Sequence, residues 1–274
     1  MYQPLLIADS GGTKTDWCYV DSHQKKHFFS SESYHPSNWS EEFIERIKKY
    51  WDQFPEYKSA ELHFFCAGCL KPEKSEELTN IFQKIGFSEV TVKSDLHAAG
   101  VALYGIENGN VAILGTGSVF FKWKEFEVMD IRGGLGFEKG DEGSGFYFGK
   151  LLYQAYENSE LSIEQKHIFE KHIDIESLKG ALINQYQIKK QFSQIAEILK
   201  DYKNEFKDWH QENVSLFFES IGFNNHNLQI RIVGGYFAEH SSILIPFLSG
   251  LGVEVEEFVK KPIGPLVDYM AHLS

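Results

Sequence analysis

Apolar and polar positions near the start of the chain predict two strands joined by a tight turn. Residues 5–8 are apolar, residues 9–16 are rich in Gly, Thr and Ser, and a second, mostly apolar run extends to residue 20. A similar pattern returns at residues 111–121. Because the chain turns straight back into a second strand in each copy, we expect two β-hairpins and not a strand that leads into a helix.

After the first hairpin the hydrophobic period lengthens to that of helices packed on a sheet. We expect a third strand, then helix, strand, helix, strand and helix, with the later strands parallel and covered on both faces. The first helix, capped by Ser40, is expected to bury Phe43, Ile44, Ile47, Trp51 and Phe54. The elements that follow are a strand at 61–66, a helix around 78–85 closed by Gly86, a strand from 90 that ends at Ser94-Asp95, and a helix from Leu96.

The second half repeats this organisation with different connections. Turn residues at 108–110 separate the two units. We predict an α/β protein with two domains, 1–109 and 110–274, and expect the last helix to pack back on the first domain. After the second hairpin, the predicted order is a strand at 127–131, a Gly-rich loop, helical sequence over about 143–223 with short turns, a strand at 228–233, a helix after Gly234-Gly235, a strand at 253–258, and a last helix from Ile263.

Composition and charge exclude several classes of protein. The 274 residues are 42% hydrophobic and 15% aromatic, which is enough for two modest cores. Asp and Glu total 39 against 27 Lys and Arg, a net charge of −12, and no dense basic run occurs. We therefore expect no nucleic acid and no membrane as partner. No signal-peptide pattern precedes the first strand and no long apolar run follows, which predicts a cytoplasmic protein.

The three cysteines, Cys18, Cys66 and Cys69, are interpreted as buried, reduced thiols. An odd number does not suit a disulfide framework. Residues 66–69 form a C-x-x-C pair, but a structural zinc site needs four ligands and no second pair exists. Buried thiols are therefore favoured over a metal or redox site.

The turns of both hairpins suit the binding of phosphate. Glycine lets the backbone turn and approach a ligand, while successive N–H groups and hydroxyls form an anion-binding nest. For residues 10–13 alone, a tight hairpin without a ligand is an equally good interpretation, but two copies in equivalent positions favour phosphate. Neither a Walker A pattern nor G-x-G-x-x-G is present. Two such hairpins suggest two lobes that close on one polyphosphate.

Two aspartates are expected at strand ends beside these turns. Asp9 ends a buried strand next to glycines and can hold Mg²⁺ directly or through water. Asp95 ends a strand and begins a helix, so it is either a helix cap or a catalytic group. Ligands of open α/β sheets bind at the carboxyl ends of strands, which predicts that Asp9, Asp95 and the Thr116 turn line one cleft.

A Gly-rich segment at 133–145 carries Asp141 and Glu142 just before a helix. A flexible surface loop is the simpler interpretation, but glycines beside acids and a helix N-terminus favour the close approach of a polar ligand. A sugar hydroxyl or a metal would suit the acids. Gly234 and Gly235 either let a flat adenine approach the backbone or form a plain strand-to-helix turn.

Taken together, these motifs resemble the BadF/BadG/BcrA/BcrD ATPase family, and within it the N-acetylglucosamine kinase-like members of the actin, Hsp70 and sugar kinase superfamily. The motifs span the whole chain in the family's order. The ordered set is specific for the family and much less so for the substrate. The matching segments are 7–16, 66–69, 94–95, 114–118, 140–145, 233–235 and 262–269.

The resemblance implies two ribonuclease H-like domains hinged over a cleft, with ATP between them. It implies that Asp9 organises Mg²⁺, and that Asp95 is the base that accepts a proton from the sugar's 6-hydroxyl as it attacks the γ-phosphate. The ATP-binding positions that it implies are Ser10, Gly11, Gly12, Thr13, Lys14, Thr116, Gly117, Gly234 and Gly235. The sugar-binding positions that it implies are Asn38, Asp95, Ser118, Gly134 and Asp141.

The chain departs from the family pattern at positions that concern the sugar. The Asn that follows the first hairpin in such kinases matches Asn38 in one alignment and His35 in another. Leu135 stands in place of a common Trp, and Val119 in place of a frequent Asn. These changes leave the phosphate-binding residues intact and concern the specificity for an acetylated sugar. Two further departures, at usually apolar positions, are Glu138 and Lys139.

The leading hypothesis is an ATP-dependent hexosamine kinase that forms N-acetylglucosamine 6-phosphate. One alternative is an ATPase that drives electron transfer into a partner enzyme, as in the 2-hydroxyacyl-CoA dehydratase activators of this family. Those hold an iron–sulfur cluster on cysteines of the later domain, and no cysteine follows Cys69 here. The other alternative is a non-catalytic sugar-sensing module. The expected partners are an amino sugar and ATP, and a homodimer is left open.

Overall fold

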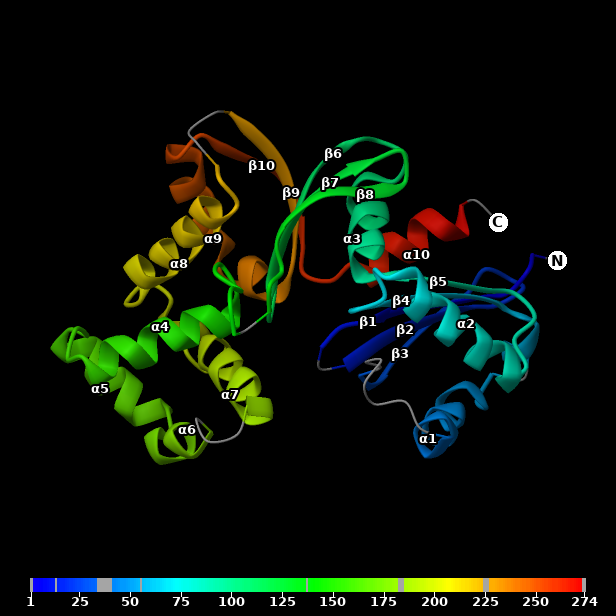
Figure 1. The fold of residues 1–274 in the computed structure, drawn as a ribbon, viewed down its shortest axis with the longest axis horizontal. Helices are drawn as coiled ribbons and strands as arrows, with labels where there is room; N and C mark the ends of the chain where they lie inside the picture. Colours follow the sequence, from blue (N-terminus) through cyan, green and yellow to red (C-terminus); the bar gives the residue numbers. More distant parts are fainter. Residues whose placement is uncertain are drawn as a thin grey trace. The chain divides into compact units, whose positions relative to one another are not determined.

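Five strands near the N-terminus form the first mixed sheet (Figure 1). The predicted hairpin is present, because β1 (Leu5–Ser10) and β2 (Lys14–Val20) pair antiparallel. On the far side of β2 lies β3 (Lys26–Glu32), also antiparallel. On the other side of β1, β4 (Glu61–Cys66) and then β5 (Val90–Ser94) run parallel to it, as predicted. The structure, a computed structural model, describes residues 2–12, 14–33, 41–54, 56–136, 138–181, 185–223 and 227–272.

Alternate residues of β1 face opposite sides of this sheet, and each side has its own apolar core. Leu6 and Ala8 pack on one side with Trp17 and Trp51. Leu5 and Ile7 pack on the other side with residues of α3 and α10. The sheet is therefore covered on both faces. The helices of this unit are α1 (Glu41–Trp51), the short 3₁₀ helix η2 (Tyr57–Ser59), α2 (Pro72–Ile85), α3 (Asp95–Tyr104) and α10 (Ile263–Ala271).

Two helix boundaries of the first unit differ from those predicted by several residues, and α3 begins at Asp95, one residue before the predicted start at Leu96. α2 begins at Pro72, earlier than its apolar pattern indicated. The pattern did not reveal this start because the first turns are mostly exposed, while the buried residues, Leu78 and Phe82, come later. Gly86 closes α2 as expected, with a φ of 116°. α1 ends at Trp51, so Phe54, which the pattern placed on its apolar face, follows the helix instead.

The second mixed sheet is built around the second predicted hairpin. β6 (Gly109–Leu114) and β7 (Ser118–Lys124) pair antiparallel. β9 (Leu228–Val233) runs parallel to β6, and β10 (Val253–Val259) runs parallel to β9. With β8 (Glu127–Gly133), the order is β10-β9-β6-β7-β8.

Among the described residues of this second unit, six helices share its apolar core. α4 and α7 pack so closely that a Cβ atom at Gly149 would lie 2.1 Å from the carbonyl oxygen of Phe192, so this contact requires glycine. The core contains large buried side chains such as Phe148 and Phe169. The helices are α4 (Gly145–Glu157), α5 (Ile163–His172), α6 (Ile175–Ala181), α7 (Gln185–Ile198), α8 (Lys207–Ser220) and α9 (Gly235–Gly250), with η3 (Lys200–Tyr202) between α7 and α8.

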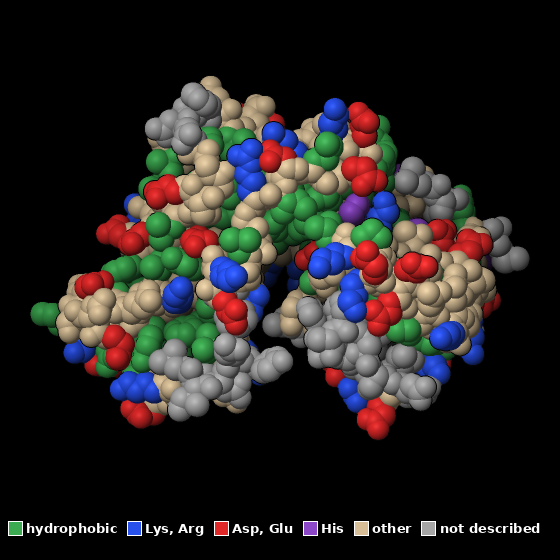
Figure 2. Space-filling view, viewed as in Figure 1, with side chains coloured by type: hydrophobic (Ala, Val, Ile, Leu, Met, Phe, Trp, Pro, Cys, Tyr) green, Lys and Arg blue, Asp and Glu red, His purple; other side chains and the backbone are tan. Residues whose placement is uncertain are grey.

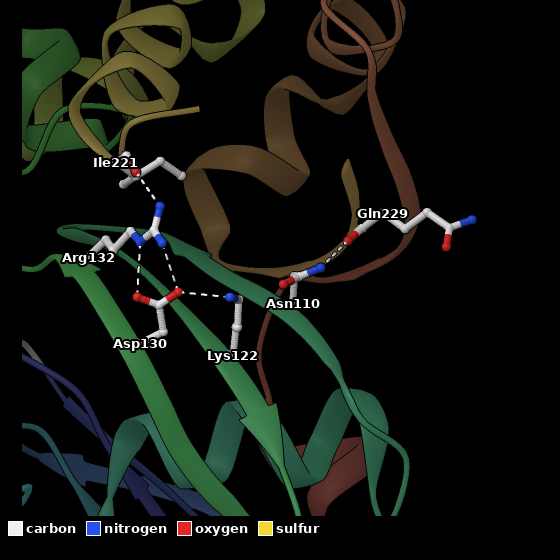
Figure 3. Close-up of polar contacts among 6 residues, drawn as sticks. All are labelled: Asn110, Lys122, Asp130, Arg132, Ile221 and Gln229. Carbon is white, nitrogen blue, oxygen red and sulfur yellow. Dashed lines mark hydrogen bonds and ion pairs between the residues drawn. The ribbon is translucent and has the colours of Figure 1, made fainter. Parts of the chain in front are cut away.

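Polar side chains connect the strands of the second sheet just before the Gly-rich segment (Figure 3). Arg132 of β8 donates two hydrogen bonds to Asp130 and a third, of 3.0 Å, to the carbonyl oxygen of Ile221 at the end of α8. Lys122 of β7 also pairs with Asp130, at 3.0 Å. These contacts fix the end of β8, where the segment 133–145 begins.

The chain divides into two units by its internal contacts. The first contains residues 1–107, 125–128 and 262–274, and the second contains 108–124 and 129–261. α10 thus groups with the first unit, where it packs on α3. The predicted domain limits, 1–109 and 110–274, stay a prediction.

Acidic and basic side chains are intermixed on the face seen in Figure 2. Among the described residues, no helix is both long and apolar enough to cross a membrane.

Candidate active site

The carboxyl ends of three parallel strands lie side by side in the first unit. Ser10 at the end of β1 is in register with Cys66 at the end of β4, and Cys66 is in register with Ser94 at the end of β5. Asp9 and Asp95, next to these residues, are therefore brought to the same edge of the sheet. This edge is where open α/β sheets bind ligands.

The first hairpin turn is held by hydrogen bonds of its own backbone and neighbours. The Gly11 N–H donates to the Lys14 carbonyl at 3.1 Å, and the Ser33 hydroxyl donates to the Gly11 carbonyl at 2.5 Å. The buried Ser10 hydroxyl bonds to that of Thr15 at 2.8 Å, so its side chain braces the hairpin. Gly12 is exposed, with no atom within 4 Å of a Cβ built on it. Thr13 lies outside the described residues.

Asp95 is the first residue of α3, and its carboxyl group has a shifted pKa. Burial raises the pKa of its carboxyl group to about 6, although its Oδ1 accepts a hydrogen bond from the Leu96 N–H at 3.1 Å. Beside it, the Ser94 hydroxyl bonds to His97 Nδ1 at 2.9 Å, and burial lowers the pKa of His97. A carboxylate with this pKa is ionised at neutral pH and is a stronger base than an exposed aspartate.

Asp9 fits a Mg²⁺ ion that keeps most of its water. It lies opposite Asp16 across the hairpin, and Asp16 accepts a hydrogen bond from the Ser30 hydroxyl at 2.7 Å and pairs with Lys14 at 3.3 Å. No group of three or more His, Cys, Asp or Glu residues is gathered for a metal within the described part of the chain. Mg²⁺ bound to phosphates uses one or two carboxylates, so a single aspartate such as Asp9 is compatible with such a site.

The cysteines of this unit are buried thiols, as predicted. Cys18, Cys66 and Cys69 are free and buried. The hydrogen bond with Cys69 and burial both raise the pKa of Cys66, which keeps its thiol protonated at neutral pH.

In the second unit, Asp141 lies directly against the second hairpin turn. Its Oδ1 accepts a hydrogen bond from the Ser118 N–H at 3.2 Å, and Lys189 Nζ lies 3.6 Å from its Oδ2. A Cβ atom at Gly117 would be 2.9 Å from Asp141 Oδ1, so a larger residue in the turn would push this carboxylate out of its position. Asp141 is buried and has a φ of 70°, a conformation that non-glycine residues adopt at a cost and often at functional sites.

Three of the predicted sugar-binding positions thus gather around one turn. Besides Asp141 and Ser118, Gly134 belongs to this group, since its N–H donates to the Ser118 carbonyl at 3.0 Å. Asp95, the fourth, belongs to the first unit. Asn38 and its alternative His35 lie outside the described residues.

A cavity of about 230 Å³ opens beside the same turn. Gly115 and Thr116 form one wall, and residues of α7 and α9 form the others. Gly235 lines it, whereas Gly234 and Gly117 do not belong to its lining. Gly234 packs on β6, where a Cβ atom would lie 2.2 Å from the Leu114 carbonyl oxygen. The full lining is Gly115, Thr116, Gly145, Ser193, Ala196, Glu197, Gly235, Tyr236, Glu239 and His240.

Several of these lining residues were not predicted from the sequence. Tyr236, Glu239 and His240 follow the Gly-Gly pair at the spacing of one helix face, which is a signal that could have found them. Ser193 and Glu197 are on α7, whose sequence carries no mark of a ligand.

Nearly the whole chain matches solved structures that are named as sugar kinases or candidate sugar kinases. A candidate N-acetylglucosamine kinase from Porphyromonas gingivalis matches with a TM-score of 0.87 at 21% identity, over 98% of this chain and 99% of that one. The two chains share one fold, an α/β fold with two mixed sheets. A candidate N-acetylglucosamine kinase from Chromobacterium violaceum has a TM-score of 0.68 at 15% identity, over 98% and 99% of the chains.

A third structure carries ligands. A glucokinase of the ROK family from Streptomyces griseus, in complex with glucose and AMPPNP, matches with a TM-score of 0.54 at 15% identity, over 99% of both chains. No family model and no curated protein matches the chain. At these identities the likeness establishes the fold, and the chemistry has to be argued from the residues.

Proposed function

We propose that the protein is an ATP-dependent kinase that transfers the γ-phosphoryl group of ATP to the 6-hydroxyl of N-acetylglucosamine. The observation that carries this proposal is Asp95, a carboxylate with a pKa of about 6 that shares a sheet edge with Asp9 and the first glycine turn. The order of motifs along the chain supports a place among the N-acetylglucosamine kinase-like members of the BadF/BadG/BcrA/BcrD family. The fold supports the class of reaction.

In this proposal Asp95 is the general base. Its carboxylate accepts the proton of the attacking sugar hydroxyl, a role that typically contributes about 10² to 10⁴ to the rate. A pKa near 6 serves this role, because the group is ionised at neutral pH yet more basic than an ordinary aspartate. The bond that Asp95 accepts from the Leu96 N–H keeps the carboxyl group oriented.

The two glycine turns would hold the phosphates through their backbone N–H groups, with Gly11, Gly12, Thr13 and Lys14 in the first and Thr116 and Gly117 in the second. Asp9 would hold Mg²⁺, which neutralises charge on the phosphates when it is bound. The adenosine would occupy the cavity beside Thr116 and Gly235.

The sugar would be bound by Asp141, Ser118, Gly134 and Asn38. The Asp141 carboxylate would accept hydrogen bonds from sugar hydroxyls through Oδ2, which is buried in this structure and has no hydrogen-bond partner among the described residues, with Lys189 Nζ 3.6 Å away. Two acceptors on one carboxylate would let Asp141 support the turn and the sugar at once.

The test is ADP release by the purified protein with a panel of sugars. N-acetylglucosamine, glucosamine, N-acetylmannosamine and N-acetylmuramic acid would each be added with MgATP. We expect turnover that depends on added sugar and is highest with N-acetylglucosamine. Rates equal to the sugar-free background across the whole panel would rule out the proposal, and sugar binding without turnover would indicate a sensing module instead.

A further inference from the structure

Asn213 of α8 is fully buried and uses both ends of its side-chain amide. Its Oδ1 accepts a hydrogen bond from the Gly143 N–H at 2.8 Å. Its Nδ2 donates to the Ser144 carbonyl at 3.0 Å and to the Tyr236 hydroxyl at 3.0 Å. One residue therefore joins α8 to two segments that are distant in the sequence, the end of the Gly-rich loop and the start of α9.

The loop held by Asn213 is the support of the second hairpin turn. The Gly145 N–H donates to the Gly115 carbonyl at 2.8 Å. The Ser144 hydroxyl caps α4 and donates to the Asp141 carbonyl at 2.5 Å, and Asp141 in turn binds the backbone of β7. Movement of Ser144 would therefore reach the turn through two routes, Gly145 and Asp141.

The backbone at Gly143 lies close against α8, which leaves little room for another side chain to replace Asn213 as its hydrogen-bond partner. Its φ is 82°, and a Cβ atom there would lie 2.7 Å from Cβ of Phe217. The backbone N–H thus approaches α8 closely enough for the Asn213 amide to reach it. A side chain shorter than Asn at position 213 would leave this buried donor without a partner.

On the other side, Asn213 fixes a wall of the cavity. Tyr236 lines the cavity, and its hydroxyl also bonds to His210 Nδ1 at 2.9 Å. Burial lowers the pKa of His210 well below its usual value, so the ring is neutral and its Nδ1 can accept a hydrogen bond from the Tyr236 hydroxyl. Burial also raises the pKa of Tyr236, which keeps that proton on the hydroxyl. His210 is itself stacked on Phe148 of α4, with ring centroids 3.9 Å apart.

We propose that Asn213 is a positioning residue of the nucleotide site, which holds the cavity wall at Tyr236 and the support of the Thr116 turn in one fixed arrangement. The adenosine and the phosphates of one nucleotide then meet groups that are already correctly spaced, and less binding energy is lost to ordering them. This inference rests on the proposed function, because it takes the cavity and the turn to bind ATP.

The experiment compares ADP binding and ATP kinetics in three variants. Asn213→Asp keeps the acceptor for Gly143 but loses the donors to Ser144 and Tyr236. Tyr236→Phe removes only the hydroxyl, and with it the branch from Asn213 to the cavity and the hydrogen bond to His210. Ser162→Ala is the control, since it removes the hydrogen bond that the Gln165 N–H donates to the Ser162 hydroxyl in the capping box of α5, in the same unit and outside the lining of the cavity.

We expect Asn213→Asp to weaken the binding of MgADP by about tenfold or more, with a parallel rise in KM for ATP. The reason is that a buried polar group left without a hydrogen bond typically costs a free energy equivalent to about tenfold or more in an equilibrium constant. Tyr236→Phe should show a smaller loss in the same direction. KM for the sugar should stay within about twofold in Tyr236→Phe, which leaves the hydrogen bonds of Asn213 to the loop that carries Asp141 in place. Ser162→Ala should lower the melting temperature without changing either KM.

Titration of the unaltered protein with MgADP separates the two claims. If it binds no MgADP, the proposed function itself fails. If it binds MgADP and the folded Asn213→Asp and Tyr236→Phe variants bind it equally well, Asn213 supports only stability and the inference is wrong. Should Asn213→Asp fail to fold, Tyr236→Phe alone tests the inference. A higher KM for ATP in Tyr236→Phe would support it, and an unchanged KM would overturn it.

Discussion

Replacing Asp95 by Asn is expected to abolish the kinase activity and, at neutral pH, to stabilise the protein. Burial raises the pKa of Asp95 from an ordinary 3.8 to about 6, so the folded state disfavours the ionised form. This difference corresponds to about 3 kcal/mol at most. An amide has no such penalty, and its oxygen can still accept the bond from the Leu96 N–H. A catalytic group that costs stability is a common consequence of tuning its pKa.

The direction in which stability changes with pH follows from the number of protons bound by the folded and the unfolded state. Between pH 3.8 and 6 the unfolded chain has released the Asp95 proton while the folded chain retains it, so the stability of the unaltered protein falls as the pH rises. Above pH 6 both states are ionised and the penalty is complete. The stability difference between Asp95→Asn and the unaltered protein should therefore be smaller at pH 5 than at pH 8, by about 1 kcal/mol.

The assay is urea unfolding at pH 5 and pH 8, combined with ADP release at pH 8. Asp52→Asn, an exposed aspartate after α1, is the control and should change neither quantity. We expect Asp95→Asn to be more stable than the unaltered protein at pH 8 and to lose at least about 10² in kcat. Equal or lower stability at pH 8 would contradict the burial argument, and full activity would contradict the role as base.

Three further predictions follow from the same structure. The kcat of the unaltered protein should rise with pH through an acid limb near pH 6, because the Asp95 carboxylate must be ionised to accept a proton; a rate that is flat from pH 5 to 8 would speak against this. Gly234→Ala should destabilise the protein by several kcal/mol, measured by thermal unfolding, because its Cβ would lie 2.2 Å from the Leu114 carbonyl oxygen. Gly180→Ala, in α6 with no atom near its Cβ, should be neutral or stabilising, and equal effects of both would refute the packing argument. Asp141→Asn should raise KM for the sugar by about tenfold while MgADP binding changes little, and a rise in KM for ATP alone would assign Asp141 to the nucleotide.

Much of the fold could be predicted from the sequence because local patterns and tertiary structure agree. The strand at 228–233 was predicted with its observed limits, since its alternating apolar residues are bounded by turn residues and the Gly-Gly pair. Both hairpins were predicted because no helical period follows either turn. The start of α2 was missed, because its first turns from Pro72 face water and carry little hydrophobic signal.

The site was harder to predict, because its parts depend on contacts between distant segments. Glycine and aspartate motifs pointed to both turns, to Asp95 and to Asp141. The close fit of Asp141 against Gly117 depends on the path of the whole Gly-rich loop, which no local pattern encodes. Asn213 lies in an ordinary helix, and its three partners become visible only when α8, α9 and the loop are placed together.

The central claim, phosphoryl transfer to an amino sugar, is tested most directly by mass spectrometry of a reaction containing MgATP and N-acetylglucosamine. We predict the appearance of N-acetylglucosamine 6-phosphate together with an equal amount of ADP, and the absence of both with Asp95→Asn. ADP formed without a phosphorylated sugar, or the same yield from the Asp95→Asn variant, would contradict the account.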